Sequence, residues 1–234
     1  MLSKEKIEKI SSEVKKCWEQ ESQKEYFIDI AKGKEIGHRL ADLVDEKTTA
    51  VITINHLTKS QYDGRGEKRS RSMGDIWVKD FQIYHPVNVK TGIVGHEGQP
   101  NMVSLKKILD AIINRCIDSY YLLMVKFEIS SKISSSVYFV DMLNYIDFLS
   151  FDSGPGQVML NAKKFIENYE TYKKPNLEIK QKVEQLMVLY KNAEYRLRQN
   201  RKRVFSMYKS KVDLFLESDE IVVTTETQSA LLLK

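Results

Sequence analysis

The stretch GDIWVKDFQIYHPVNVKTG, from Gly74 to Gly92, decides the fold predicted for this chain of 234 residues. Its apolar and β-branched residues are typical of two β-strands. An acid, Asp75, stands at the tip of the first strand, and Lys90 stands near the end of the second. If the two strands pair as an antiparallel hairpin, the Asp75 carboxylate and the Lys90 ammonium meet at the same edge of a sheet.

Helical and strand patterns alternate on both sides of this hairpin. Before it, the sequence predicts an amphipathic helix over residues 1–23, a second helix over 25–46 and a strand at TTAVITINH, residues 48–56. After it, the sequence predicts a helix over 103–117, a strand buried on both faces over 120–129, strands within 135–151, and helices over 160–173 and 176–218. The predicted fold class is therefore α/β, with a central mixed β-sheet flanked by helices and a helical C-terminal part.

Composition favours one soluble domain. The hydrophobic share of 42% is enough for one sizeable core, so we expect a single domain whose core covers about 25–130 and whose helical part covers about 160–218. No signal-peptide pattern and no run of about 20 apolar residues occurs, so we expect a cytoplasmic protein without a membrane partner. The formal net charge of +5 is unevenly distributed, which favours polyanionic partners.

Asp75 and Lys90 are the residue types that phosphodiester hydrolysis requires. A carboxylate can hold Mg²⁺, which stabilises developing negative charge and acidifies bound water, while a lysine can position the attacking water beside the phosphate. A structural interpretation stands beside this one, because an Asp after Gly is often part of a turn and a lysine at a strand end is usually solvated.

Three segments taken together raise the weight of the functional interpretation. Gly74-Asp75-Ile76, then Asn88-Val89-Lys90-Thr91, then GQPN before the helix that begins MVSLKKI, resemble the core of the PD-(D/E)xK nucleases as found in type II restriction endonucleases. The resemblance implies a helix, three strands, a helix and a further strand, which is the order predicted for residues 25–129. It also implies Mg²⁺-dependent, sequence-specific cleavage of double-stranded DNA in a restriction-modification system, by a homodimer with one cutting centre in each protomer.

The chain departs from the family pattern at two positions. Gly74 stands where the motif has Pro, and Asn88 stands where Asp or Glu is usual. The resemblance gives catalytic roles to Asp75, Asn88 and Lys90, with Mg²⁺ held by Asp75, by the Asn88 amide oxygen and by the backbone carbonyl of Val89. The alternative is that Asn88 only forms hydrogen bonds within the sheet edge.

An acid from the first core helix often assists the metal site in this family. Glu35 and Asp42 are the candidates, because seven residues separate them and they share one face of the predicted helix. Glu35 is the preferred catalytic residue of the two, and the alternative is an ordinary solvated acid.

Two groups of residues are candidates for contacts with DNA. A basic loop would emerge near Asp75, and the segment after the lysine strand carries side chains suited to reading bases. The loop residues are Lys59, Arg65, Lys68, Arg69 and Arg71, and the candidates after the strand are Gln99, Asn101 and Ser104. A second basic concentration, over residues 196–211, is either a track for phosphates or a solvated helix face.

Two other classes of function remain open from the sequence. One is a non-catalytic nucleic-acid-binding protein on the same fold, with its centre degraded by Asn88. The other is an interaction protein whose long C-terminal helix forms a coiled coil, although the apolar positions there do not keep a strict heptad.

Overall fold

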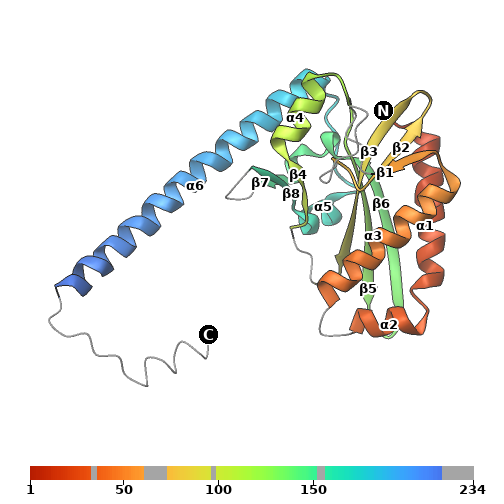
Figure 1. Ribbon diagram of the computed structural model, residues 1–234, viewed down its shortest axis with the longest axis horizontal. Coiled ribbons are helices and arrows are strands. Elements are labelled where there is room, and N and C mark those ends of the chain that lie inside the picture. The colour runs from red at the N-terminus through yellow and green to blue at the C-terminus, as the bar shows by residue number, and fades with distance from the viewer. Residues whose placement is uncertain (33–35, 61–72, 96–98, 152–155, 218–234) are drawn as a thin grey trace. The chain divides into compact units, whose positions relative to one another are not determined.

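The computed structural model describes residues 1–32, 36–60, 73–95, 99–151 and 156–217. The chain divides into two compact units, Met1–Lys191 and Asn192–Lys234. In the described residues the first unit is α/β, with a mixed sheet covered by helices on both faces (Figure 1). The predicted fold class is confirmed at this level.

The described part of the main sheet has five strands in the order β1-β2-β3-β5-β6. The strands are β1 (Thr58–Ser60), β2 (Ile76–Asp80), β3 (Ile83–Ile93), β5 (Tyr121–Ile129) and β6 (Ile133–Asp141). β2 and β3 form the predicted antiparallel hairpin, with Ile76 opposite Val87. β3 then pairs in parallel with the central strand β5, which makes the sheet mixed. The hairpin is thus anchored to the most deeply buried strand of the sheet.

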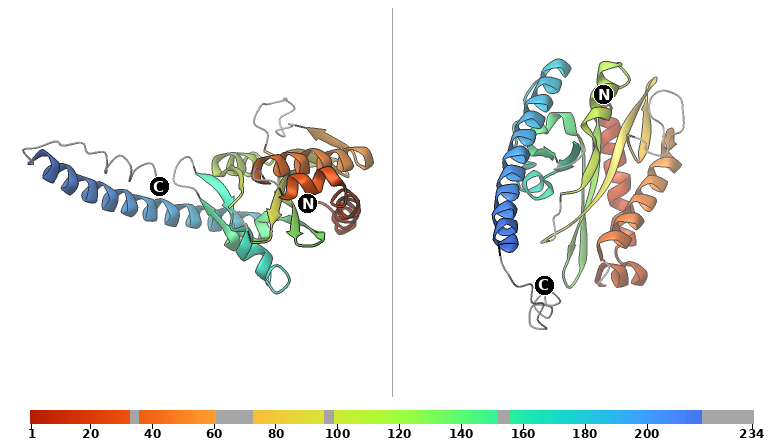
Figure 2. Two further views of the ribbon diagram at one scale, coloured as in Figure 1. Left: turned by 90° about the horizontal axis from the view of Figure 1, so that it is seen from below. Right: turned by 60° about the vertical axis from the view of Figure 1, so that its left-hand side comes forward.

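One face of the sheet is covered by the N-terminal helices α1 (Lys4–Glu21), α2 (Glu25–Lys32) and α3 (Ile36–Asn55), as Figure 2 shows. Trp18 of α1, Phe27 of α2 and Phe127 of β5 meet in the core between them, with ring centroids 5.1 to 5.6 Å apart. These aromatic contacts lock the helices onto the sheet.

The opposite face carries helix α4 (Leu105–Ile113), a small sheet and helix α5 (Ala162–Asn168). The small sheet has the strand order β4-β8-β7 in the described residues, from β4 (Asn101–Ser104), β8 (Gln157–Leu160) and β7 (Leu149–Phe151). Two 3₁₀ turns, Met142–Asn144 and Ile146–Phe148, connect it to β6. The first unit ends within helix α6 (Ile179–Leu216), whose Leu186 is fully buried in this core.

The strand predicted at residues 48–56 is wrong, because α3 continues as a helix to Asn55. The buried positions of α3 recur every four residues, at Leu40, Val44, Thr48 and Ile52, which is the spacing of one helix face. Thr48 accepts a hydrogen bond of 3.0 Å from the Trp18 indole. Tertiary packing therefore overrides the β propensity of this β-branched segment.

The helix predicted over 25–46 is divided in the structure between α2 and α3, with residues 33–35 outside the described part. Among the described residues no helix has the length and apolar character needed to cross a membrane.

Candidate active site

The hairpin brings Asp75 and Lys90 together. Asp75 lies directly before β2, and its Oδ2 atom is 3.7 Å from the Nζ atom of Lys90 on β3. The same oxygen accepts a hydrogen bond of 2.7 Å from the backbone N–H of Val89. Both side chains are partly open to solvent, with 31% of Asp75 and 22% of Lys90 exposed. A carboxylate and an ammonium are therefore held next to each other at a position that solvent reaches.

Gly74 allows the chain to place Asp75 there. A Cβ atom at position 74 would lie 2.8 Å from the backbone nitrogen and 2.9 Å from the carbonyl oxygen of Val87. These distances are too short for any side chain, so a residue other than glycine has to push β3 away. Gly74 is required here by close approach of the two backbones.

Replacing Gly74 by Ala should therefore lower the free energy of unfolding by about 2 kcal/mol, because the strain falls on backbone atoms that have little freedom to move. Gly92→Ala is the matched control, since its Cβ would make ordinary contacts of 3.6 Å or more with side-chain atoms of Met124 and Lys126. Urea denaturation of both variants tests this, and equal stability of the two variants would contradict the requirement for glycine at 74.

A second carboxylate, that of Asp45 in α3, lies in the same electrostatic environment. Burial, together with the negative charge of Asp75, raises the pKa of Asp45 to about 6, and Lys90 opposes the shift. Its Oδ1 atom is buried and has no hydrogen-bond partner within the described residues. Asp45 is thus a partly buried acid that feels the charges of Asp75 and Lys90, and its Oδ1 atom can still accept a hydrogen bond or bind a cation.

Asp45 was not among the helix acids predicted for this site. The predicted candidates were Glu35, which lies outside the described residues, and Asp42, which is exposed. Once the buried stripe through Val44 and Thr48 is known, residue 45 falls on its flank and residue 42 on the far side of the helix. The signal was available in the sequence, but it required α3 to extend through the segment predicted as a strand.

Asn88 is buried, with 4% of its surface exposed. Its Nδ2 atom donates hydrogen bonds to the Tyr120 hydroxyl, at 2.7 Å, and to the backbone carbonyl of Met73, at 3.4 Å. Its Oδ1 atom has no partner in the described part of the chain. Burial, and then the negative charge of Asp75, raise the pKa of Tyr120, so this phenol stays protonated and donates to the Met73 carbonyl at 3.1 Å. The amide of Asn88 is therefore fixed through its nitrogen.

The other predicted site residues lie in several places. Val89 contacts Asp75 through its backbone N–H, whereas its carbonyl was the predicted metal ligand. The loop positions Arg65, Lys68, Arg69 and Arg71 lie outside the described residues. Lys59 is exposed on β1, and its Nζ atom is 4.6 Å from the centroid of the Tyr84 ring.

The candidates after the lysine strand belong to a different part of the fold. Asn101 opens β4 and Ser104 ends it, opposite Gln157 of β8, and Gln99 lies two residues before this strand. Gln99 and Asn101 are exposed, while Ser104 is half-buried at the start of α4. Asn101 and Ser104 belong to the small sheet and Gln99 to the segment that leads into it, whereas Asp75 and Lys90 are carried by the hairpin of the main sheet.

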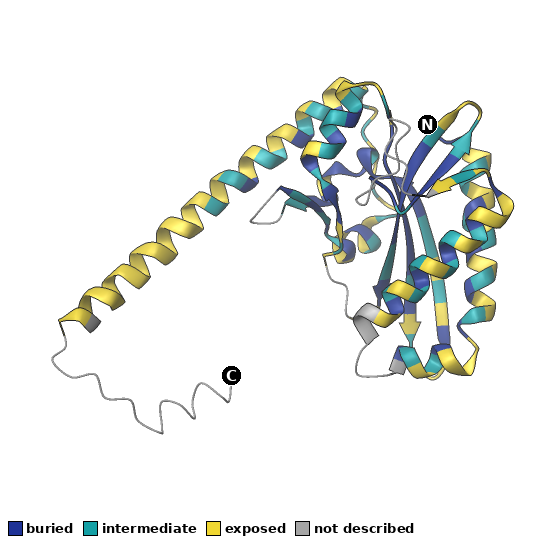
Figure 3. Ribbon diagram, in the orientation of Figure 1, coloured by how far each residue is buried: buried dark blue, intermediate teal, exposed yellow. Residues whose placement is uncertain are grey.

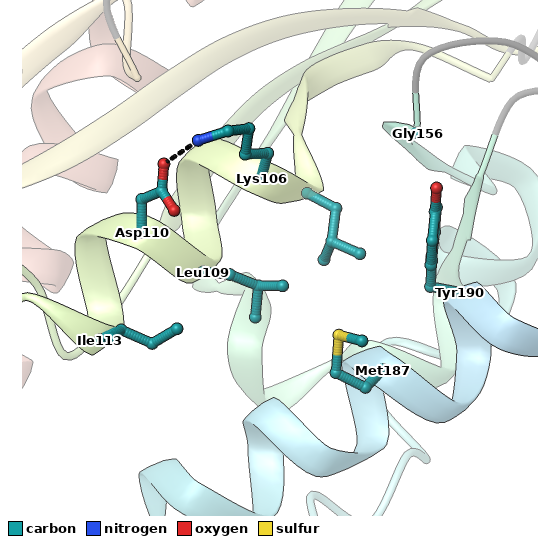
Figure 4. A pocket seen from close by; sticks show the side chains of 8 residues that line it. Lys106, Leu109, Asp110, Ile113, Gly156, Met187 and Tyr190 are labelled. Atoms are coloured by element: carbon teal, nitrogen blue, oxygen red, sulfur yellow. Dashed lines mark hydrogen bonds and ion pairs between the residues drawn. The ribbon is translucent and has the colours of Figure 1, made fainter.

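A separate groove lies between α4 and the first part of α6 (Figure 4). It has a volume of about 310 Å³ and is mostly apolar, with an ion pair between Lys106 and Asp110 at its edge. Leu105, Leu109, Ile113, Met187 and Tyr190 complete most of its lining. The residues of the Asp75–Lys90 site are not among those that line the groove. The candidate active site is therefore identified by its charged side chains and not by a pocket.

Comparison with known proteins adds no assignment to this geometry. No protein-family model matches the chain, and no curated protein matches it. Within the described ranges, no three His, Cys, Asp or Glu side chains gather into a metal-binding group. The interpretation of the site therefore depends on the arrangement of Asp45, Asp75, Asn88 and Lys90.

The raised pKa of Asp45 predicts that this acid reduces stability at neutral pH. Because its pKa is about 6 in the folded state and near 3.8 in a free side chain, the folded state binds the proton more tightly, and stability falls as pH rises from about 4 to above 6. Asp45→Asn should raise the free energy of unfolding at pH 8 by about 1 to 2 kcal/mol, after allowance for partial solvent screening, and flatten this pH dependence.

The matched control for Asp45→Asn is Asp42→Asn, which removes an exposed acid from the same helix. Urea denaturation of the three proteins at pH 5 and pH 8 separates the effects. A stability gain of the same size in Asp42→Asn would attribute it to general charge rather than to the buried site.

Proposed function

We propose that the chain is a Mg²⁺-dependent endonuclease that hydrolyses phosphodiester bonds in double-stranded DNA at specific sequences, as type II restriction enzymes do. The observation that carries the proposal is the Asp75 carboxylate 3.7 Å from the Lys90 ammonium at the end of a β-hairpin. The order α3, β1-β2-β3, α4, β5, with β3 parallel to β5, also supports it: it follows the order that the resemblance implies, apart from β4 of the small sheet, which stands between β3 and α4.

The oxygens around this pair suit a hard divalent cation. The carboxylate of Asp75 is accessible, and the buried Oδ1 atoms of Asp45 and Asn88 have no hydrogen-bond partner in the described residues. Buried acceptors without partners are rare in folded proteins, and carboxylate and amide oxygens belong to the all-oxygen ligand set of Mg²⁺. When bound, the cation would stabilise negative charge on the phosphate and acidify a water molecule.

The chain's own residues would orient and neutralise the reacting groups. Lys90 presents a positive charge beside the phosphate and can donate a hydrogen bond to the attacking water. The Val89 N–H holds the Oδ2 atom of Asp75 in place. Because a carboxylate is planar, this bond also restricts the position of the Oδ1 atom. Asp45, with a pKa of about 6, must lose its proton before it can act as a ligand, so activity should increase as pH rises through 6.

Asn88 provides a test of the metal shell. Asn88→Leu should raise the Mg²⁺ concentration needed for half-maximal cleavage by about tenfold, because it removes the amide oxygen while it keeps a side chain of similar volume. Tyr120→Phe is the control, since it removes the hydroxyl that Asn88 contacts and leaves the Asn88 oxygen in place. An identical shift in both variants would assign the effect to packing, and an unchanged metal response in Asn88→Leu would remove position 88 from the metal shell.

The assembly proposed for this activity is a homodimer, since two centres related by a two-fold axis would cut both strands of a palindromic site. Double-stranded DNA is the proposed partner, and a restriction-modification system is the proposed setting.

The second candidate function is binding of nucleic acid without cleavage. Asn88 favours this candidate for two reasons. It stands where the family pattern has a charged ligand, and its hydrogen bond to Tyr120 is one that a purely structural residue would also form. Incubation of purified protein with long mixed-sequence DNA, with and without Mg²⁺, decides between the two. Discrete fragments that appear only with Mg²⁺ support the nuclease, and DNA that is retarded but uncut supports the second candidate.

A further inference from the structure

The helical segment 192–216, the part of α6 in the second unit, carries a concentrated positive charge. Seven Lys and Arg residues stand against two acids, Glu194 and Asp213, so its formal net charge of +5 equals that of the entire chain. The remainder of the sequence is neutral in total. The cations are Arg196, Arg198, Arg201, Lys202, Arg203, Lys209 and Lys211, and all are exposed (Figure 3).

Some of the cations are arranged in rows along the helix axis. Arg196 and Arg203 are seven residues apart, as are Lys202 and Lys209, so each pair repeats after about two turns, or roughly 10 Å. The two rows lie roughly 120° apart around the helix, with the neutral residues Gln199 and Ser206 between them, and together they form a broad basic stripe. The stripe runs along the helix axis, as a surface that follows phosphates would.

Apolar side chains on the rest of this segment raise two other possibilities, a second copy of the chain and a membrane surface. Val204, Phe205 and Tyr208 are 43% to 70% exposed. However, Arg201 and Lys211 stand among the apolar positions, in the seam 197-201-204-208-211 that a coiled coil would use. Self-association would place like charges in that seam, and insertion into lipid would bury both cations.

We propose that segment 192–216 is a DNA-binding arm whose basic stripe contacts the phosphates of a duplex. The charge of the segment is complementary to a polyanion and unfavourable for a second copy. The choice of duplex DNA as the polyanion rests on the proposed function. The arm adds affinity that does not depend on sequence, separate from the residues of the Asp75–Lys90 site.

The test compares the full-length protein with two variants of equal net charge. In the arm variant, Arg196, Lys202, Arg203 and Lys209 are replaced by Gln. In the control, four exposed lysines of α1, Lys4, Lys9, Lys15 and Lys16, are replaced by Gln. Binding to a fluorescent 30-base-pair duplex is measured without divalent metal at several salt concentrations, and circular dichroism checks that each variant is folded.

We expect the arm variant to bind at least about tenfold more weakly at low salt. The slope of log affinity against log salt should fall by about 0.9 for each DNA phosphate that the helix no longer neutralises. The α1 variant should bind as the wild type does. Equal weakening of both variants, or no weakening of the arm variant, would overturn the proposal. So would binding to phosphatidylserine vesicles with no binding to the duplex, or loss of a dimer in the arm variant with its DNA affinity unchanged.

This measurement is separate from that of cleavage. A wild-type protein that binds the duplex through the arm but never cuts DNA would remove the proposed nuclease activity and leave the arm in place. A protein that cuts DNA while the arm variant binds normally would do the reverse.

Discussion

Asp75→Asn is expected to lower the rate of Mg²⁺-dependent DNA cleavage by at least about a thousandfold, because it removes the accessible carboxylate at the centre of the site. The fold should be retained. The Asn side chain keeps an oxygen that can accept the hydrogen bond from the Val89 N–H, which now goes to Asp75 at 2.7 Å. Lys90 loses an anionic neighbour 3.7 Å away, so the site becomes more positive.

This change in charge gives Asp75→Asn a second expected result. In the absence of metal the variant should bind DNA at least as tightly as the wild type does, because repulsion between the carboxylate and the phosphate is removed. Cleavage rates, thermal denaturation and DNA binding in the absence of metal are the three measurements. A variant that cuts at the wild-type rate, or that loses both fold and binding, would contradict a metal-holding role for Asp75.

Lys90→Met is expected to have a cleavage defect of similar size, about a thousandfold, since it removes the positive charge beside the phosphate and keeps an unbranched side chain. Lys79→Met on the neighbouring strand is the matched control. Lys79 is half-buried like Lys90, and its Nζ atom lies near the Tyr84 ring, 5.8 Å from the centroid. Cleavage assays on both variants separate a local role from a general loss of charge.

The expected pattern is specific. Lys90→Met should leave Mg²⁺ binding intact or stronger, because the carboxylates then lack a competing cation, while turnover is lost. If Lys79→Met is as damaging as Lys90→Met, or if Lys90→Met cleaves normally, the assignment of Lys90 is wrong.

The sequence predicted the central hairpin correctly because its information is local. Alternation of apolar residues fixes both strands, and an antiparallel pairing then fixes the distance between Asp75 and Lys90. The parallel neighbour β5 was also predictable, since a strand buried on both faces is nearly all apolar, as Tyr121 to Val125 are.

Other features depend on contacts between residues distant in sequence. The small sheet joins β4 to β8, whose partners Asn101 and Met159 are far apart in the chain, and neither strand shows a pattern long enough to predict. Asp45 was missed for a related reason, because its place beside Asp75 follows from the docking of α3 against the sheet. Local β propensity alone predicted a strand at residues 48–56, where the structure has the end of α3.

The helical state of TTAVITI, residues 48–54, depends on that docking, and this has implications for how the protein behaves when heated. Its β-branched residues are helical in the native state, where Thr48 is bonded to Trp18 and Ile52 is buried. Once α3 detaches, the segment has the composition of an aggregation-prone strand, with no charge and no proline. Thermal unfolding should thus become less reversible as protein concentration rises, because strands of different chains pair. A synthetic peptide of residues 44–58 that stayed helical and monomeric would argue against this segment as the origin of aggregation.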